Sequence, residues 1–311
     1  MSFRSKARGL LPSSQAVRAL KLLAALLAVG AFLFVFAGQA RALQEHEWHF
    51  DGTYLGLAAL MALGRGVFIV YPWWRIIRAW GYGLPWNRAL RLYFHSGFAR
   101  YIPGQWWFVA GRAYLAERQG VPPAATVAAT ALETVILTGT ALLTGLAGLA
   151  TIPSGGVLAW TWMLALGGVV TLLLPVSPAL LARLTDWLLH VMGREKLPAG
   201  LSIKEMIRVL AACFANWVMY GLVAALLLAG LSGGGYLAQA PATIGIFALS
   251  VLGGAILLFM PQGIIVREGV LVYLLHTLLG VPVPVGLGVA ALTRLFSMGA
   301  EGVWALAALR I

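Results

Sequence analysis

Long apolar runs are the feature that most limits what this chain can fold into. A helix needs about 20 mostly apolar residues to cross a bilayer. Eight stretches approach or exceed that length: 20–39, 53–72, 124–150, 157–176, 206–231, 242–260, 264–281 and 285–309. Only 10% of the 311 residues are charged, against about 25% in soluble domains. The sequence therefore predicts an all-α polytopic membrane protein with about eight transmembrane helices, in one integral membrane domain over residues 1–311, and its short, charged seventh run is the weakest span.

Basic residues are concentrated in three of the segments that flank these runs. They lie in and just after the N-terminal tail (1–18), in the region 73–122, and between the fourth and fifth runs, whereas the alternate loops hold one basic residue, Arg41. Because cytoplasmic loops carry the excess of lysine and arginine, we expect both termini on the cytoplasmic side of the cell inner membrane. Topology thus explains the net charge of +12, and the expected partners are membrane lipids and not nucleic acid.

The first run has a second interpretation. Ala40-Arg41-Ala42 follows it and fits the A-x-A cleavage site of a signal peptide. The run is long for a signal peptide, and the later charge pattern requires a span there, so a retained helix is favoured. The lone Cys213 lies inside an apolar run, so the sequence predicts neither a disulfide frame nor a cysteine metal site.

Two Pro/Gly breaks indicate interrupted helices. The stretch YIPGQWWFVAGRAYLAERQGVP (101–122) is too apolar for an ordinary loop yet carries charges, and a partial echo with a second Gly-Val-Pro follows near the C-terminus. The echo predicts one or two re-entrant or interrupted helical hairpins, the first within an interfacial region 73–122, and a possible repeat over 205–311. Alternatively, Gly-Val-Pro marks a tight turn in two unrelated places. The turn residues are Pro103, Gly104, Pro261 and Gly263.

Charged side chains inside the apolar runs are expensive and need a partner or a wet cavity. Each costs about 2.5 to 3.5 kcal/mol on insertion scales. Adjacent Arg267 and Glu268 point about 100° apart on a helix, so we expect each to have a different partner and Glu133 to neutralise Arg294. The charged residues at this depth are Arg65, Glu133, Arg267, Glu268 and Arg294, with Glu301 closer to the interface.

Two explanations of these charges stay open. Buried ion pairs that lock helix packing are one. The other is a visiting anion, because three arginines against two glutamates leave a positive excess and the guanidinium fork matches phosphate oxygens. A backbone turned at the first Pro/Gly break would expose further donors to a phosphate. The candidate substrate-binding residues are Arg100, Arg112, Glu133, Arg267, Glu268 and Arg294.

Catalytic motifs are sparse in the sequence. It has no Gly-rich P-loop, no HExxH motif and no cysteine ligand set. Glu45, Glu47 and Asp51 in the first outer loop superficially resemble the acidic residues of membrane glycosyltransferases that use polyprenyl-phosphate sugars, but the large outer loops of such enzymes are missing. We therefore expect no enzyme activity, cofactor or metal, and keep such a glycosyltransferase and a non-transporting membrane scaffold as alternatives.

Two signatures resemble a known family. The segment 101–122 followed by the helix with Glu133 is similar to one signature of the flippase-like family named for the transmembrane region of lysylphosphatidylglycerol synthases. PQGIIVREGVLVYLL (261–275) resembles its second signature, a Pro/Gly turn followed by an Arg-Glu pair, and the last helix with Arg294 fits the same pattern. The resemblance covers about residues 15–310 and implies an eight-span fold that moves a lipid, or a lipid carrying a polar head, between leaflets.

The sequence departs from this family in two ways. No part of the 311 residues resembles the aminoacyl-transferase domain of the full synthases, so the resemblance does not imply lipid lysinylation. Many members have an acidic residue shortly after the first Pro-Gly, where this chain has Gln105-Trp106-Trp107-Phe108, so no preference for cationic lipids is carried over. We expect translocation of an anionic lipid, such as a phospholipid or a polyprenyl-phosphate-linked sugar, either downhill or coupled to an ion or proton.

A mechanism follows from these residues as a hypothesis. Arg112, Arg267 and Arg294 hold the phosphate, and Glu133 and Glu268 balance these charges when the site is empty. The two Pro/Gly breaks allow the halves of the protein to rock around the site.

Overall fold

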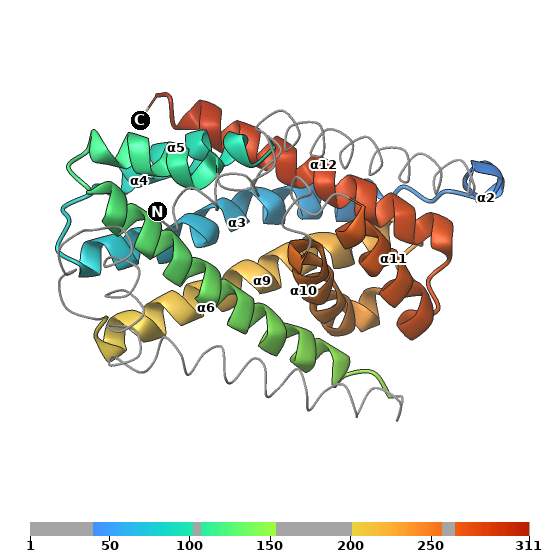
Figure 1. Cartoon of the computed structure of the whole chain (residues 1–311). Helices are drawn as coiled ribbons and strands as arrows, with labels where there is room; N and C mark the ends of the chain where they lie inside the picture. Colours follow the sequence, from blue (N-terminus) through green and yellow to red (C-terminus); the bar gives the residue numbers. More distant parts are fainter. Residues whose placement is uncertain (1–39, 102–106, 154–200, 257–264, 311) are drawn as a thin grey trace, which may run out of the picture.

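The computed structural model describes residues 40–101, 107–153, 201–256 and 265–310, which are helical apart from short turns and loops (Figure 1). No strand occurs in these ranges, so the predicted all-α fold is confirmed there. The helices are α2 (Ala40–Glu45), α3 (Gly52–Ala79), α4 (Trp86–Gly97), α5 (Trp107–Glu117), α6 (Pro123–Leu149), α9 (Ile203–Leu231), α10 (Ala240–Ile256), α11 (Val266–Leu279) and α12 (Val283–Ala307), with 3-10 turns η2 (Phe98–Tyr101) and η4 (Leu237–Gln239).

Five helical segments in the described part of the chain are long and apolar enough to cross a membrane. They are α3, α6, α9, α12, and α10 together with the turn before it. Each overlaps one of the apolar runs predicted to span, and α3 continues beyond Pro72 to Ala79. The predicted spans 20–39 and 157–176 lie outside the described residues. The described helices support a multi-pass membrane protein.

Helices α3 and α9 lie side by side and run in opposite directions. At one end, the backbone N–H of Asp51, just before α3, donates to the carbonyl of Gly230 near the end of α9 (3.1 Å). At the other end, Arg75 of α3 is ion-paired with Glu205 in the first turn of α9. The side chains of Asp51 and Ser202 cap the two helices by accepting hydrogen bonds from backbone N–H groups of their first turns.

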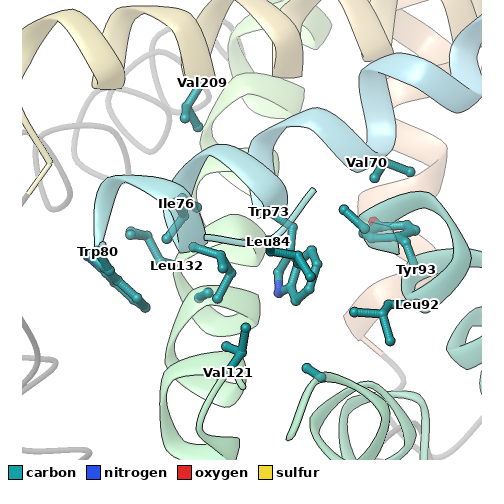
Figure 2. Packing of buried hydrophobic residues seen from close by; sticks show 14 of the residues in the cluster. Val70, Trp73, Ile76, Trp80, Leu84, Leu92, Tyr93, Val121, Leu132 and Val209 are labelled. Atoms are coloured by element: carbon teal, nitrogen blue, oxygen red, sulfur yellow. The ribbon is translucent and has the colours of Figure 1, made fainter. Parts of the chain in front are cut away.

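An apolar cluster fills the space between α3, α4, α6 and α9. Trp73 of α3 is completely buried, and Leu92 and Tyr93 of α4 pack in the same cluster with Leu132 of α6 and Val209 of α9 (Figure 2). The cluster fixes α4 against the long helices.

Helices α6 and α10 cross at a point where each helix has a glycine. A Cβ added to Gly148 would lie 2.6 Å from Cα of Gly245, and one added to Gly245 would lie 2.7 Å from Cα of Gly148. Small residues allow membrane helices to approach closely, and close packing is their main source of association energy inside a bilayer. The crossing therefore depends on both glycines.

Helices α4 and α5 form a hairpin. Arg88 at the start of α4 donates a hydrogen bond to Gln119 just beyond α5 (2.7 Å), and Arg112 within α5 lies 3.5 Å from the Ser96 hydroxyl near the end of α4. The two helices are therefore antiparallel. The predicted turn at Pro103 and its neighbour falls outside the described residues.

Helices α10 and α11 form a second antiparallel hairpin. Gly254 near the end of α10 faces Arg267 at the start of α11, and the Tyr236 hydroxyl, before α10, donates to the carbonyl of Gly280, just after α11 (3.4 Å). Helix α11 has 14 residues, which corresponds to about 21 Å, against about 30 Å for the hydrocarbon core. By its length α11 does not cross a bilayer alone, unlike the predicted span 264–281.

Both hairpins join the following long helix through the same Gly-Val-Pro turn. Gly120 and Gly280 have φ angles of 80° and 68°, in the left-handed region that glycine adopts without a Cβ clash. Pro122 and Pro282 then precede α6 and α12 at the N-cap position. The sequence echo therefore corresponds to the same local structure at both places.

The two hairpin-and-helix units point in opposite directions (Figure 1). Val121 at the start of α6 shares an apolar cluster with Val209 near the start of α9. In contrast, Gly288 near the start of α12 lies against Leu231 at the end of α9. Helix α6 thus runs parallel to α9, and α12 runs antiparallel to it.

Candidate functional site

A buried ion pair ties the first hairpin to the helix that follows it. Arg112 of α5 is only 1% exposed, and its Nη1 lies 3.0 Å from Oε2 of Glu133 on α6. The Tyr93 hydroxyl on α4 donates to Oε1 of the same carboxylate (2.9 Å), and the Arg112 guanidinium stacks 3.8 Å from the Tyr93 ring centre. Burial of these charges is tolerated because each is paired and hydrogen-bonded.

A second buried cluster surrounds Glu268 at the start of α11. Its Oε1 accepts from Nε of Arg267 (3.2 Å) and from Nε of Arg294 on α12 (2.9 Å), and its Oε2 accepts from the backbone N–H of Ile265 (2.8 Å). Nη1 of Arg267 also donates to the Tyr220 hydroxyl on α9 (3.0 Å). One carboxylate is thus shared by two arginines, and the cluster has an excess positive charge.

The prediction that Arg267 and Glu268 do not pair is wrong. Glu268 lies in the first helical turn, where its carboxylate folds back to accept the free N–H of Ile265, as is usual for a glutamate three residues into a helix. This orientation brings it beside the long side chain of Arg267. The second part of the expectation holds, because each residue also has its own partner, Tyr220 for Arg267 and Arg294 for Glu268.

The predicted neutralisation of Glu133 by Arg294 is also wrong. Glu133 pairs with Arg112, and Arg294 pairs with Glu268. Each pair joins a hairpin to the helix that follows it. The positive and negative partners are interchanged between the two units. The first hairpin contributes the arginine and its helix the glutamate, whereas the second hairpin contributes the glutamate and its helix the arginine.

Arg65, which the sequence predicts at bilayer depth but not as a site residue, is a further functional candidate. Its Nε donates to Oδ1 of Asn216 on α9 (3.1 Å), and its guanidinium stacks 3.8 Å from the centre of the Tyr220 ring. The signal for its role was present in the sequence, as a single arginine in the middle of an apolar run. What the sequence did not show is that Tyr220 connects it to the second cluster.

A small pocket lies between the two clusters. Tyr93, which holds Glu133, is on its wall, and so is Arg65, which stacks on Tyr220. Glu301 and Trp304 of α12 line it as well. The residues that line this pocket are Ala62, Arg65, Gly66, Ile69, Tyr93, Phe94, Gly97, Ser297, Ala300, Glu301 and Trp304.

The structure distributes the predicted site residues over two clusters. Arg112 and Glu133 form one, and Arg267, Glu268 and Arg294 form the other. The side chain of Arg100 and the four predicted turn residues (Pro103, Gly104, Pro261 and Gly263) lie outside the part of the structure that is described.

The acidic loop before α3 has a structural role at one position. The Asp51 carboxylate accepts a hydrogen bond from the Thr53 N–H (2.8 Å) and caps α3. Within the described ranges, no group of three or more histidine, cysteine, aspartate or glutamate side chains is arranged to hold a metal ion.

Comparison with known proteins gives the family. The family model of the lysylphosphatidylglycerol synthase TM region matches residues 21–300. A search of curated proteins finds no match for this chain. Because the family model covers most of the sequence, including both hairpins and both charged clusters, the chain belongs to the lysylphosphatidylglycerol synthase transmembrane-region family.

Proposed function

We propose that this protein moves a lipid with an anionic headgroup between the leaflets of the cell inner membrane. The observation that carries the proposal is the pair of buried ion clusters, each at the junction of a hairpin and its following helix, in two units of opposite direction. Ionisable groups at such depth face substrate pathways in many membrane proteins. Opposed repeats with interrupted helices are the usual architecture of carriers that alternate access.

The two hairpins enter the membrane from opposite faces in this proposal. The end of the bundle that carries Arg75, Arg78, Arg88 and Arg208 is cytoplasmic by the positive-inside rule. The α4–α5 hairpin starts and ends there, and so does the last helix, near Arg310. The α10–α11 hairpin starts and ends at the other face, and the predicted spans 20–39 and 157–176 lie outside the described residues.

An anionic headgroup acts by competing for the arginines. Phosphate oxygens match the guanidinium fork as carboxylates do, so a phosphate entering from one face replaces Glu133 on Arg112, and one entering from the other replaces Glu268 on Arg294. Loss of either ion pair frees a hairpin from its helix. When no lipid is present, Glu133 pairs with Arg112 and Glu268 is shared by Arg267 and Arg294, so every one of these arginines contacts a carboxylate and one positive charge is in excess.

The energy source in this proposal is the lipid gradient or a coupled ion. The described residues include no helix N-terminus preceded by a Gly-rich phosphate loop, which is what nucleotide binding by a P-loop requires. Glu133 and Glu268 are the carboxylates proposed to take part in such coupling, since both are buried inside the bundle.

Reconstitution in liposomes tests the proposal. We expect the Arg267→Ala/Arg294→Ala variant to move a fluorescent anionic phospholipid much more slowly than the wild type. The matched control is Arg88→Ala/Arg208→Ala, which removes two exposed arginines and should leave the rate unchanged. Transport at the wild-type rate by a folded Arg267→Ala/Arg294→Ala variant would remove these arginines from the mechanism.

A second variant separates loss of function from loss of fold. The triple variant Arg267→Gln/Glu268→Gln/Arg294→Gln keeps three polar side chains and leaves no charge in the cluster, so it should fold. If it folds and transports normally, the cluster is structural. A wild type that moves no lipid at all contradicts the proposed function itself.

A further inference from the structure

The outward face of α5 carries aromatic and basic side chains in one line. Trp107 and Tyr114 are 56% and 55% exposed. Ala110 and Arg118 are exposed as well, and spacings of three, four and four residues place all four on one side of a helix. The other side packs against α4 and α6 and carries Arg112, which is 1% exposed. Helix α5 thus presents one face to the buried ion pair and the other to the surroundings of the bundle.

Residue types along this outward face follow the order of groups in a phospholipid. Gln119, directly after Arg118, accepts a hydrogen bond from Arg88 at the end of the bundle that is proposed to be cytoplasmic. Trp107 lies eleven residues before Arg118, which is about 16 Å along the helix axis. The charged end of the face is therefore at the level of lipid headgroups, and the apolar end reaches toward the acyl chains, with tryptophan and tyrosine between water and hydrocarbon as in other membrane proteins.

Tyr114 holds the Arg118 guanidinium at this surface. Nη2 of Arg118 donates to the Tyr114 hydroxyl, and the guanidinium lies 4.7 Å from the centre of the Tyr114 ring. A side chain that is already ordered loses less conformational entropy when it binds a ligand, and the guanidinium fork fits two oxygens of a phosphate. Because Arg118 is exposed, a headgroup reaches it without entering the bundle.

The charge at this end of the bundle favours an anionic partner. Among the residues that the structure describes, seven basic side chains are exposed there and one acidic side chain, an excess of six positive charges. Basic residues near a membrane surface attract anionic lipids over about the Debye length. The exposed basic residues are Arg78, Arg88, Arg91, Arg118, Lys204, Arg208 and Arg310, and the exposed acidic residue is Glu117.

We propose that the outward face of α5 is a docking surface for an anionic phospholipid of the cytoplasmic leaflet, with the phosphate on Arg118 and the acyl chains along Ala110 and Trp107. The inference rests on the proposed function, which places this end of the bundle at the cytoplasmic face, and it adds the place where the lipid first binds. The docked lipid lies against the helix whose opposite face carries Arg112. The second hairpin differs, because α11 exposes Tyr273 (66%) but no lysine or arginine.

Photocrosslinking in nanodiscs tests this assignment. The nanodiscs contain equal amounts of phosphatidylglycerol, which is anionic, and phosphatidylcholine, which is zwitterionic, and p-benzoylphenylalanine replaces Ala110. Mass spectrometry gives the ratio of the two lipids attached to the protein. We expect an excess of phosphatidylglycerol, and we expect Arg118→Gln to lower the ratio about fivefold, the effect of about 1 kcal/mol from one arginine near a membrane surface. The control Lys204→Gln removes an exposed charge at the same end of the bundle and should leave the ratio unchanged.

Two further measurements separate the docking surface from a general effect of charge. Tyr114→Leu keeps an apolar side chain and removes the contacts that hold Arg118, so it should also lower the ratio. The same probe in place of Tyr273 reports the lipids beside α11, where the ratio should be lower than at Ala110. An undiminished ratio in either variant, or equal ratios at the two probe positions, overturns the assignment. Attachment of the Ala110 probe to a second copy of the chain overturns it in favour of a protein interface.

The crosslinking result is independent of transport. A wild type that collects phosphatidylglycerol at α5 but moves no lipid in liposomes contradicts the proposed function and leaves the docking surface in place. A wild type that moves lipid, but whose lipid ratio at α5 is unchanged by Arg118→Gln, contradicts only this inference.

Discussion

The indole of Trp304 occupies the space where a side chain of residue 66 would lie. Gly66 is on α3, and a Cβ there would overlap the Trp304 ring. The missing side chain allows the indole to reach the carbonyl of Leu63 and to close one wall of the Arg65 pocket. A glycine on one helix thus determines where the last helix packs.

Gly66→Ala should destabilise the protein. The added methyl forces Trp304 out of its position, and overpacking of this kind costs about 1 to 3 kcal/mol. Gly56→Ala is the matched control on the same helix, since a Cβ there meets nothing within 4 Å and alanine is the better helix former. Thermal unfolding in detergent should show a lower Tm for Gly66→Ala only. An equal Tm for the two variants would show that Trp304 can move aside without loss of stability.

Glu133→Gln should be strongly destabilising because it leaves Arg112 buried without a counterion. Removal of one partner of a buried ion pair typically costs about 3 to 5 kcal/mol. Arg112→Gln/Glu133→Gln removes both charges and should be more stable than Glu133→Gln. The measurement is chemical denaturation of the three forms. A double variant less stable than the single one would indicate that the charges are not paired as described.

Gly148→Ala should weaken the crossing of α6 and α10. Its Cβ would meet the backbone of Gly245 at 2.6 Å, and a backbone cannot move aside as a flexible side chain does. The control is Gly299→Ala on α12, where a Cβ meets nothing within 4 Å. Protease resistance of the purified variants reports the difference, and equal resistance would show that the helices separate at no cost.

The sequence predicts the helices here better than it predicts their contacts. Apolar runs predict long helices because a chain that crosses the bilayer must satisfy its backbone N–H and C=O groups internally, and a helix does so. The repeated Gly-Val-Pro also corresponds to a turn at both places, since a left-handed glycine followed by proline has few alternatives. Both signals are local, so they are visible in the sequence.

Partners of the buried charges were predicted poorly because they depend on distant segments. Glu133 was assigned to Arg294, but Arg112, on the preceding hairpin, folds back against it. Helical spacing predicts the direction in which a side chain leaves the helix, but a long arginine side chain can bend away from that direction. For this reason the contact between Arg267 and Glu268 is not predicted from the sequence. The depth of a charge can be inferred from the sequence, whereas its partner requires the fold.

Single cysteines test the opposite orientation of the two hairpins. Cys213 is the single cysteine of the sequence, so a Cys213→Ala background has no thiol to label. Exposed positions are available in the turns. We expect a membrane-impermeant maleimide to label Ala238→Cys, before α10, and Pro282→Cys, after α11, in intact cells. Gln119→Cys, after α5, and Arg310→Cys, after α12, should react only when the membrane is permeabilised.

The labelling pattern shows whether α10 and α11 form a hairpin on one face of the membrane or cross it, because the two arrangements predict different accessibility for Ala238→Cys and Pro282→Cys. If α10 and α11 enter and leave by one face, the residues at their outer ends react from the same side. If the chain crosses fully between them, Ala238→Cys and Pro282→Cys react from opposite sides, and Arg310→Cys changes side with Pro282→Cys. That second result would reverse the direction of α12 and so contradict the contact between Trp304 and Leu63. It would also contradict the proposed transport, which requires two units of opposite orientation.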